Sequence, residues 1–197
     1  MLRISFEGIN GTLNISFSHP TAIVFGPDHN TLFIADTLNN RIISYPSGAV
    51  VAGGNGPGNS NTTLNRPYGL VYDSVSTSCI IPNHLSHNIV RWVLGQSTRT
   101  VIAGDMQGSF GNNSALLRRP VGMKMDPMGN IYVADASNHR IQLFMAGQSD
   151  AITIAGNGTA GTSAHQLNSP YWVLLDNQLN LYVSDTYNHR VQKFFRY

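Results

Sequence analysis

The chain has 197 residues, of which 42% are hydrophobic, so it is long enough to enclose a substantial core. Only 11% of the residues are charged, against about a quarter in ordinary soluble proteins. The net charge of +2 is a small imbalance rather than a basic patch, no apolar run reaches the length of a membrane span, and the single cysteine, Cys79, excludes an intrachain disulfide.

One short motif recurs along the chain. An apolar run ends in an acidic residue, and an arginine follows five positions later. The three good copies carry Asp36 and Arg41, Asp135 and Arg140, and Asp185 and Arg190. A degenerate copy has Asn83 and Asn88 in these positions. Positions 36, 83, 135 and 185 are 47, 52 and 50 residues apart, and a period of this size indicates a repeat architecture.

Each repeat contains four short apolar runs separated by turn residues. In the third repeat, we expect strands at about residues 122–125, 131–134, 140–145 and 152–155. No window of twelve or more residues keeps apolar positions at helical spacing, so no substantial helix is expected. Four short antiparallel strands at this period predict an all-β fold made of β-propeller blades.

The motifs of this repeat resemble those of the NHL family. They are Pro-x-Gly, then Asn-x-Tyr-Val-Ala-Asp, then Asn-His-Arg-Ile, then Ile-Ala-Gly, and the resemblance covers about residues 20–197. It is weak only in the second repeat. The resemblance implies a propeller, usually six-bladed in this family, that commonly serves as a binding module attached to other domains.

The repeats divide the chain into blades. We expect an outer strand and loop of a preceding or shared blade at 1–19, blade 1 at 20–66, blade 2 at 67–119, blade 3 at 120–169, and blade 4, without its own outer strand, at 170–197. A strand at residues 2–6 could complete blade 4 and close a four-bladed ring. We favour an open arc, part of a larger propeller or multidomain protein, with apolar blade faces uncovered at both ends.

The recurring Asp and Arg residues are predicted to build the repeat. The carboxylate can accept amide protons of the turn, and the guanidinium can reach it or the neighbouring blade. Blade 2 lacks both charges, so we expect a looser turn there. Cys79 is expected to pack as a small hydrophobic residue.

No catalytic residue, metal site or cofactor is predicted. His84 and His87 are three residues apart but form a weak ligand set, because zinc needs three or four ligands. Peptidyl-α-hydroxyglycine amidating lyase, which carries the same kind of repeat, holds zinc with histidines that follow the proline of each innermost strand. The corresponding positions here are Thr21, Tyr68, Val121 and Tyr171. A propeller enzyme with a channel metal, of lyase or hydrolase type, is therefore the alternative rather than the main prediction.

The main prediction is a non-enzymatic binding or scaffold module. Loops 53–66, 104–119 and 156–169 should share one face with the Asp-to-Arg turns and present it to a protein partner or another ligand. The candidate contact residues are Arg66, Tyr68, Arg119, Tyr171 and Trp172. Arginines beside aromatic rings also fit single-stranded RNA, as in some relatives, but the chain has only two lysines.

Glycosylation sequons give a weak indication of an extracellular protein. They occur at Asn10, Asn14, Asn61, Asn112 and Asn157, most of them in the Gly-rich loops. The sequence shows no export signal, so the compartment stays open.

Overall fold

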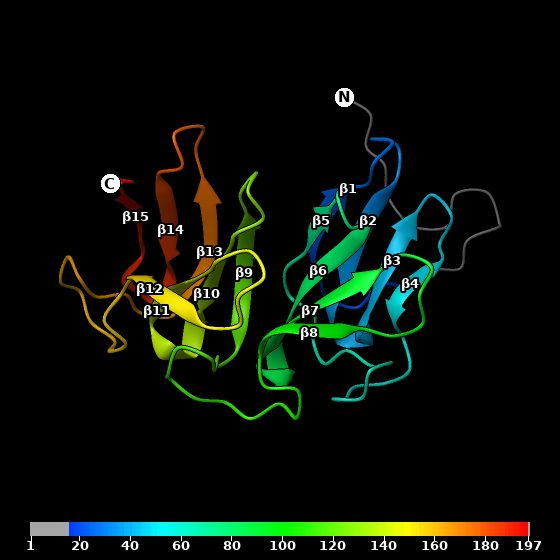
Figure 1. The fold of residues 1–197 in the computed structure, drawn as a ribbon, viewed down its shortest axis with the longest axis horizontal. Coiled ribbons are helices and arrows are strands. Elements are labelled where there is room, and N and C mark those ends of the chain that lie inside the picture. Colours follow the sequence, from blue (N-terminus) through cyan, green and yellow to red (C-terminus); the bar gives the residue numbers. More distant parts are fainter. Residues whose placement is uncertain (1–15, 197) are drawn as a thin grey trace.

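The computed structural model describes residues 16–196 and is all-β, as the sequence predicts (Figure 1). Four antiparallel sheets follow one another in chain order, and each sheet is one propeller blade. The described chain therefore has four blades, not the six that are usual for the family that it resembles. Among residues 16–196, no helix is long and apolar enough to span a membrane.

Each blade is built from strands that are adjacent in the chain. Blade 1 contains β1 (Pro20–Phe25), β2 (Leu32–Asp36), β3 (Arg41–Tyr45) and β4 (Val50–Gly53). Blade 2 contains β5 (Val71–Asp73), β6 (Ser78–Asn83), β7 (Asn88–Val93) and β8 (Thr100–Gly104). Blade 3 contains β9 (Pro120–Met125), β10 (Ile131–Asp135), β11 (Arg140–Phe144) and β12 (Ala151–Ala155). Blade 4 contains β13 (Pro170–Leu175), β14 (Leu181–Asp185) and β15 (Arg190–Phe194).

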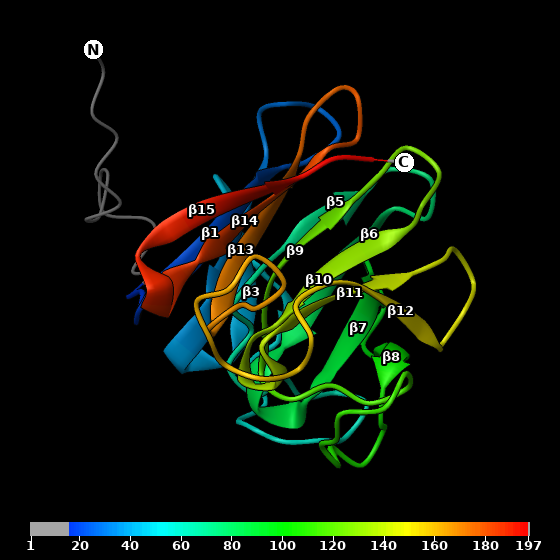
Figure 2. The ribbon, with the colours of Figure 1, turned by 90° about the vertical axis from the view of Figure 1, so that its left-hand side faces the viewer.

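Blade 4 has three strands, in the order β13-β14-β15. Its outermost strand, β15, has no partner on its outer edge among residues 16–196 (Figure 2). The outer strand predicted at residues 2–6 lies outside the described residues.

The core consists of three hydrophobic clusters, one between each pair of successive blades. Side chains alternate between the two faces of a strand, so each inner blade packs against two neighbours. In β10, Val133 belongs to the cluster shared with blade 2, and Ala134 belongs to the cluster shared with blade 4. Cys79 is fully buried in the first cluster, and this burial raises the pKa of its thiol to about 12.

Residues 16–196 form an open arc. None of the hydrophobic clusters of residues 16–196 joins blade 4 to blade 1, and these blades lie at opposite sides of Figure 1. Ile141 in β11 is 0% exposed, whereas Val191, its counterpart in β15, is 69% exposed. Ile23 and Phe25 in β1 are similarly exposed at the other end.

The turn between the second and third strands has one geometry in all four blades. A single 3-10 turn ends in a left-handed residue with φ between 52° and 55°: Asn40, His87, His139 and His189. The prediction of a looser turn in blade 2 is wrong, because the Asn83 side chain accepts the Asn65 amide just as the Asp side chains accept theirs. Blade 2 instead leaves Asn83 Nδ2 and Asn88 Oδ1 buried with no hydrogen-bond partner.

Candidate functional site on the loop face

The recurring Asp accepts hydrogen bonds from three directions. Asp135 is fully buried and accepts the Arg118 amide at 2.7 Å, the Asn138 side chain at 2.8 Å and Arg140 Nε at 2.8 Å. The same three contacts recur at Asp36 and at Asp185. Each Asp therefore ties its own turn to the loop that enters its blade.

The recurring Arg fastens that loop. Besides Asp135, Arg140 binds the carbonyls of Asn112 and Asn113 at 2.6 and 2.8 Å. Arg190 binds the carbonyls of the corresponding loop residues, Thr162 and Ser163. Loops 104–119 and 156–169 thus lie on the same face as the Asp-to-Arg turns, as the sequence analysis expects.

Blade 2 fastens its loop with a different arginine, which the sequence analysis missed. Arg99, in the turn before β8, donates from Nε to the Ser60 carbonyl at 3.0 Å and from Nη2 to the Asn59 carbonyl at 2.9 Å. These carbonyls correspond to those that Arg140 binds in the next loop. Arg99 is buried without a carboxylate partner among residues 16–196, its Nη1 has no hydrogen-bond partner, and burial lowers its pKa.

A second set of hydrogen bonds joins each blade to the next. The side chain of the left-handed turn residue accepts the amide of the residue that precedes the first proline of the following blade. Asn40 accepts the Arg66 amide at 2.8 Å, His87 accepts the Arg119 amide at 3.0 Å, and His139 accepts the Ser169 amide at 3.1 Å. The repeated His is therefore a link between blades.

These links place two predicted residues, Arg66 and Arg119, at the openings of blades 2 and 3. Both have left-handed backbones with φ of 53° and exposed side chains. His84 lies near both, since the two guanidinium groups help to lower its pKa. The Tyr68 ring lies 4.8 Å from the His84 ring. We name Arg66, Tyr68, His84, His87 and Arg119 the cationic cluster.

Both histidines of the cationic cluster have lowered pKa values. Burial, followed by the charges of Arg119 and Arg66 and by His87, lowers the pKa of His84 to about 4, against the opposing effect of its hydrogen bond to the Pro120 carbonyl. Burial and the nearby arginines also lower the pKa of His87. Since His84 Nδ1 donates to Pro120, its Nε2 is the atom that can take up a proton.

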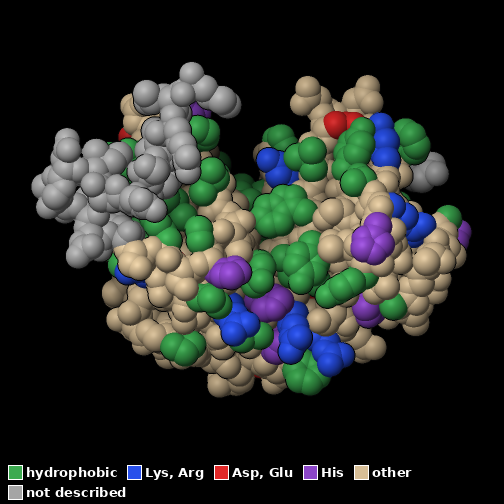
Figure 3. All heavy atoms as spheres, turned by 180° about the vertical axis from the view of Figure 1, so that it is seen from behind, with side chains coloured by type: hydrophobic (Ala, Val, Ile, Leu, Met, Phe, Trp, Pro, Cys, Tyr) green, Lys and Arg blue, Asp and Glu red, His purple; other side chains and the backbone are tan. Residues whose placement is uncertain are grey.

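A further aromatic and cationic pair extends the cationic cluster. The Phe110 ring lies 5.3 Å from the His87 ring, and the Arg118 guanidinium lies 5.0 Å above Phe110. Figure 3, a view from behind, shows histidine side chains and Lys or Arg side chains gathered in the lower part of the molecule with hydrophobic side chains among them, whereas the visible acidic side chains lie near the top.

The arginines of this region differ from those of the turns. Arg41, Arg140 and Arg190 each form an ion pair with an aspartate at 2.7 to 2.8 Å. Among residues 16–196, the side chains of Arg66, Arg118 and Arg119 form no ion pair and no hydrogen bond. Their positive charges are therefore available to a ligand.

The two remaining predicted residues lie in different places. Burial raises the pKa of the Tyr171 hydroxyl, and the charges of Tyr187, Tyr68 and Arg119 also act on it. Tyr171 therefore lies close to these three side chains. Trp172 lies against Gly122 in blade 3, and it makes no ring contact with the arginines among the described residues. The structure thus brings four of the five candidates together and separates Trp172.

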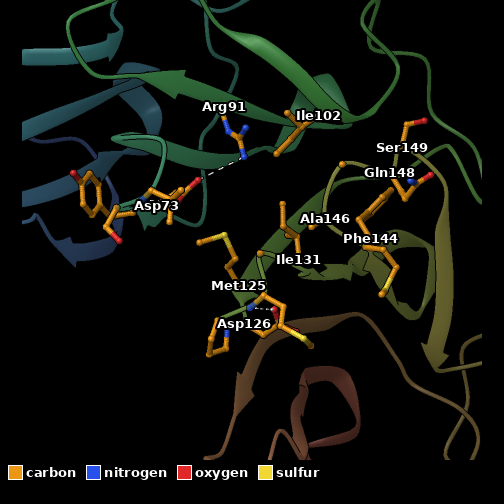
Figure 4. Close-up of a pocket in the computed structure, with 18 of the residues that line it drawn as sticks. Asp73, Arg91, Ile102, Met125, Asp126, Ile131, Phe144, Ala146, Gln148 and Ser149 are labelled. Carbon is orange, nitrogen blue, oxygen red and sulfur yellow. Dashed lines mark hydrogen bonds and ion pairs between the residues drawn. The ribbon is translucent and has the colours of Figure 1, made fainter.

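The opposite face has a cavity of about 620 Å³ between blades 2 and 3. Figure 4 shows Met125, Ile131 and Phe144 around it, with the ion pair of Asp73 and Arg91 at one side. The residues predicted from the sequence do not line this cavity. Within residues 16–196, no group of three or more His, Cys, Asp and Glu side chains could hold a metal ion.

The family model described as NHL repeat matches residues 117–144 and 173–194. These segments include the Asp-to-Arg turns of blades 3 and 4 and the repeated histidines His139 and His189. The chain carries NHL repeats. No curated protein sequence matches the chain.

Several solved structures share the fold of this NHL-repeat chain. A streptogramin B lyase matches with a TM-score of 0.63 and 14% identity over 93% of this chain and 54% of its own. An auxiliary nutrient binding protein from Bacteroides ovatus matches with a TM-score of 0.64 and 18% identity over 90% of this chain and 48% of its own. A gluconolactonase from Xanthomonas campestris matches with a TM-score of 0.67 and 15% identity over 90% of this chain and 58% of its own. The chain spans about half the length of these proteins, and the likeness concerns the fold alone.

The sequence analysis noted His84 and His87 but did not place them in the site. Its period gave a signal for His87, since His87 occupies the position of the repeated His in blades 3 and 4. Phe110 lies in a variable loop without a repeated counterpart, so its position next to His87 depends on how loop 104–119 folds.

Proposed function

We propose that the chain is a binding module that takes an acidic segment of a protein ligand on its loop face, at the cationic cluster. The observation that carries this proposal is a set of three guanidinium groups, those of Arg66, Arg118 and Arg119, which have no ion pair or hydrogen bond among residues 16–196. They lie beside two histidines whose pKa values are lowered. A surface built only to hold the repeat would pair its arginines, as the turns of blades 1, 3 and 4 do.

The cationic cluster offers suitable chemistry for carboxylates. Arginine binds a carboxylate with two parallel hydrogen bonds, and the rings of Tyr68 and Phe110 supply flat apolar surface beside it. Asp105 is the acid in the adjoining loop; its carboxylate accepts the amides of Gln107 and Ser109, and among residues 16–196 it forms no ion pair with an arginine.

Binding should also take up a proton. His84 is neutral near pH 7 because of burial and neighbouring positive charge. A bound carboxylate adds negative charge next to the imidazole, which raises its pKa. We therefore expect the wild type to bind more tightly as the pH falls from 7 toward 5. In His84→Gln, the affinity should rise less over the same pH range.

The test is calorimetric titration with an octaglutamate peptide, an uncharged Gly-Ser peptide of equal length and a single-stranded U8 RNA. We expect octaglutamate to bind, and Arg119→Ala and Arg66→Ala each to weaken binding by about ten- to a hundredfold. Arg196→Ala is the matched control, since it removes an exposed arginine from the opposite end of the sheet and should leave binding unchanged.

Equal effects of Arg196→Ala and Arg119→Ala would show non-specific attraction and contradict the proposal. Preference for U8 over octaglutamate would favour the RNA-binding alternative instead. The Gly-Ser peptide should not bind, because it brings no charge to the arginines.

A further inference from the structure

We propose that the chain associates head to tail, with blade 1 of a second copy docking on the open face of blade 4. The open face of blade 4 is the side that faces away from blade 3, formed by Trp172, Leu174, Tyr182, Val191 and Lys193. This inference does not depend on the proposed ligand.

The face has exposed apolar side chains at positions that a neighbouring blade covers in the inner blades. Paired residues share a face, so Trp172, Ser184 and Val191 form one row and Leu174, Tyr182 and Lys193 the next. Leu174 is 55% exposed and Val191 is 69% exposed. In blade 3 the position of Val191 is held by Ile141, which packs in the cluster shared with blade 4. The kind of surface that covers this face is therefore another blade of the same repeat.

Among the described residues, blade 4 also has two polar side chains that lack the inter-blade hydrogen bond made by their counterparts in other blades. His139 accepts the amide that opens blade 4, but the corresponding His189 accepts no hydrogen bond from residues 16–196. The Thr37 hydroxyl donates to the Pro67 carbonyl of blade 2 at 2.7 Å. Its counterpart Thr186 turns back on the Ser184 carbonyl at 3.4 Å. Both groups lie where the first residues of a docked blade would meet them.

Blade 1 supplies the matching groups. His19 precedes the first proline and has a φ of 54°, like Arg66 and Arg119, and its amide donates to no residue among 16–196. In the docked pair, His189 would accept the His19 amide. Ile23 and Phe25 on the inner strand of blade 1 are 68% and 59% exposed and would cover Leu174 and Val191.

Trp172 places a large side chain at a position that Gly or Ala holds in the other blades, but it does not block docking of another blade. Its counterpart Gly122 lies so close to β13 that a Cβ would meet the Tyr171 carbonyl at 2.5 Å. Ala22 holds the same position in blade 1 and still packs against blade 2. The Trp172 indole already rests against Gly122, in its own copy, so the docking blade meets a side chain that is folded back.

The contact joins two different surfaces, so a copy on one end leaves the other end free. Such heterologous contacts generate a ring when the rotation closes and an open chain when it does not. Either product requires both faces, which makes the contact testable by complementation.

The experiment uses light scattering with two double variants of the full chain, each checked for its fold by circular dichroism. One carries Leu174→Asp and Val191→Asp on blade 4, and the other carries Ile23→Asp and Phe25→Asp on blade 1. We expect the wild type to associate and each variant alone to have a mass near 21.4 kDa. An equimolar mixture should give a one-to-one complex of twice that mass, because each variant keeps the face that the other lacks.

Three results would overturn the proposal: a monomeric wild type, a mixture that stays monomeric, or a single variant that still associates. Val75→Asp is the matched control, because Val75 is 95% exposed in a turn away from both faces and its change should leave association intact. His189→Ala keeps both apolar faces and should weaken association by about two- to tenfold, as expected for one neutral hydrogen bond.

Discussion

Blades 2 and 3 hold their entering loops by the same two carbonyls but from different directions. In blade 3, Arg140 reaches them from β11 and is paired with the buried Asp135. In blade 2, Arg99 reaches the equivalent carbonyls from the turn before β8, without a carboxylate partner among the described residues. The comparison shows that a repeat can lose its charged signature and keep its geometry, while the way in which its charges are compensated changes.

The largest loss of stability should come from removing the arginine of blade 3, which is paired with an aspartate. Arg140→Ala leaves the fully buried carboxylate of Asp135 without its guanidinium, so we expect a loss of about 3–5 kcal/mol in the free energy of unfolding. Urea denaturation followed by fluorescence measures this loss. A loss below about 1 kcal/mol would contradict the structural role that these contacts support.

Removing the arginine of blade 2, which has no carboxylate partner among the described residues, should reduce stability less. Arg99→Met removes two hydrogen bonds to backbone carbonyls but strands no carboxylate, and it also removes the unpaired Nη1, so we expect a loss of about 1–2 kcal/mol. The same urea experiment compares it directly with Arg140→Ala. Equal losses would show that the counter-ion does not account for the difference between the two blades.

The smallest effect concerns pH and the histidine that lies between these two blades. His84 has a pKa of about 4 in the folded chain and an ordinary value of 6.5, so the unfolded chain binds the additional proton as the pH falls. Its contribution to stability is complete above pH 6.5 and is lost as the pH falls toward 4. Between pH 6.5 and 5 we expect a loss of about 1 kcal/mol, allowing for partial exposure. His84→Gln should flatten this part of the stability profile, and an unchanged slope would contradict the assignment.

The parts of the fold that the sequence could predict depend on short local patterns. Residues five apart, such as Asp135 and Arg140, lie on either side of one turn, and prolines and glycines fix where strands start and end. The three-stranded fourth blade follows from the same patterns.

The parts that could not be predicted depend on contacts between distant segments. Arg99 lies outside the repeat signature, and only the folded loop brings the Asn59 carbonyl to it. The expectation of a loose turn in blade 2 failed for a chemical reason. The amide oxygen of Asn83 accepts the same backbone proton as a carboxylate oxygen does, so loss of the charge does not loosen the turn.

The left-handed backbones of Arg66 and Arg119 have a consequence for how this surface can evolve. With φ of 53°, each residue adopts a conformation that costs a side-chain-bearing residue about 1–2 kcal/mol and that glycine adopts without strain. Neither side chain contributes a hydrogen bond or ion pair among residues 16–196 that would offset this strain. Substitution by glycine would relieve this strain but would also remove a guanidinium group from the loop face, so a change that stabilises the fold here also changes the charge of that face.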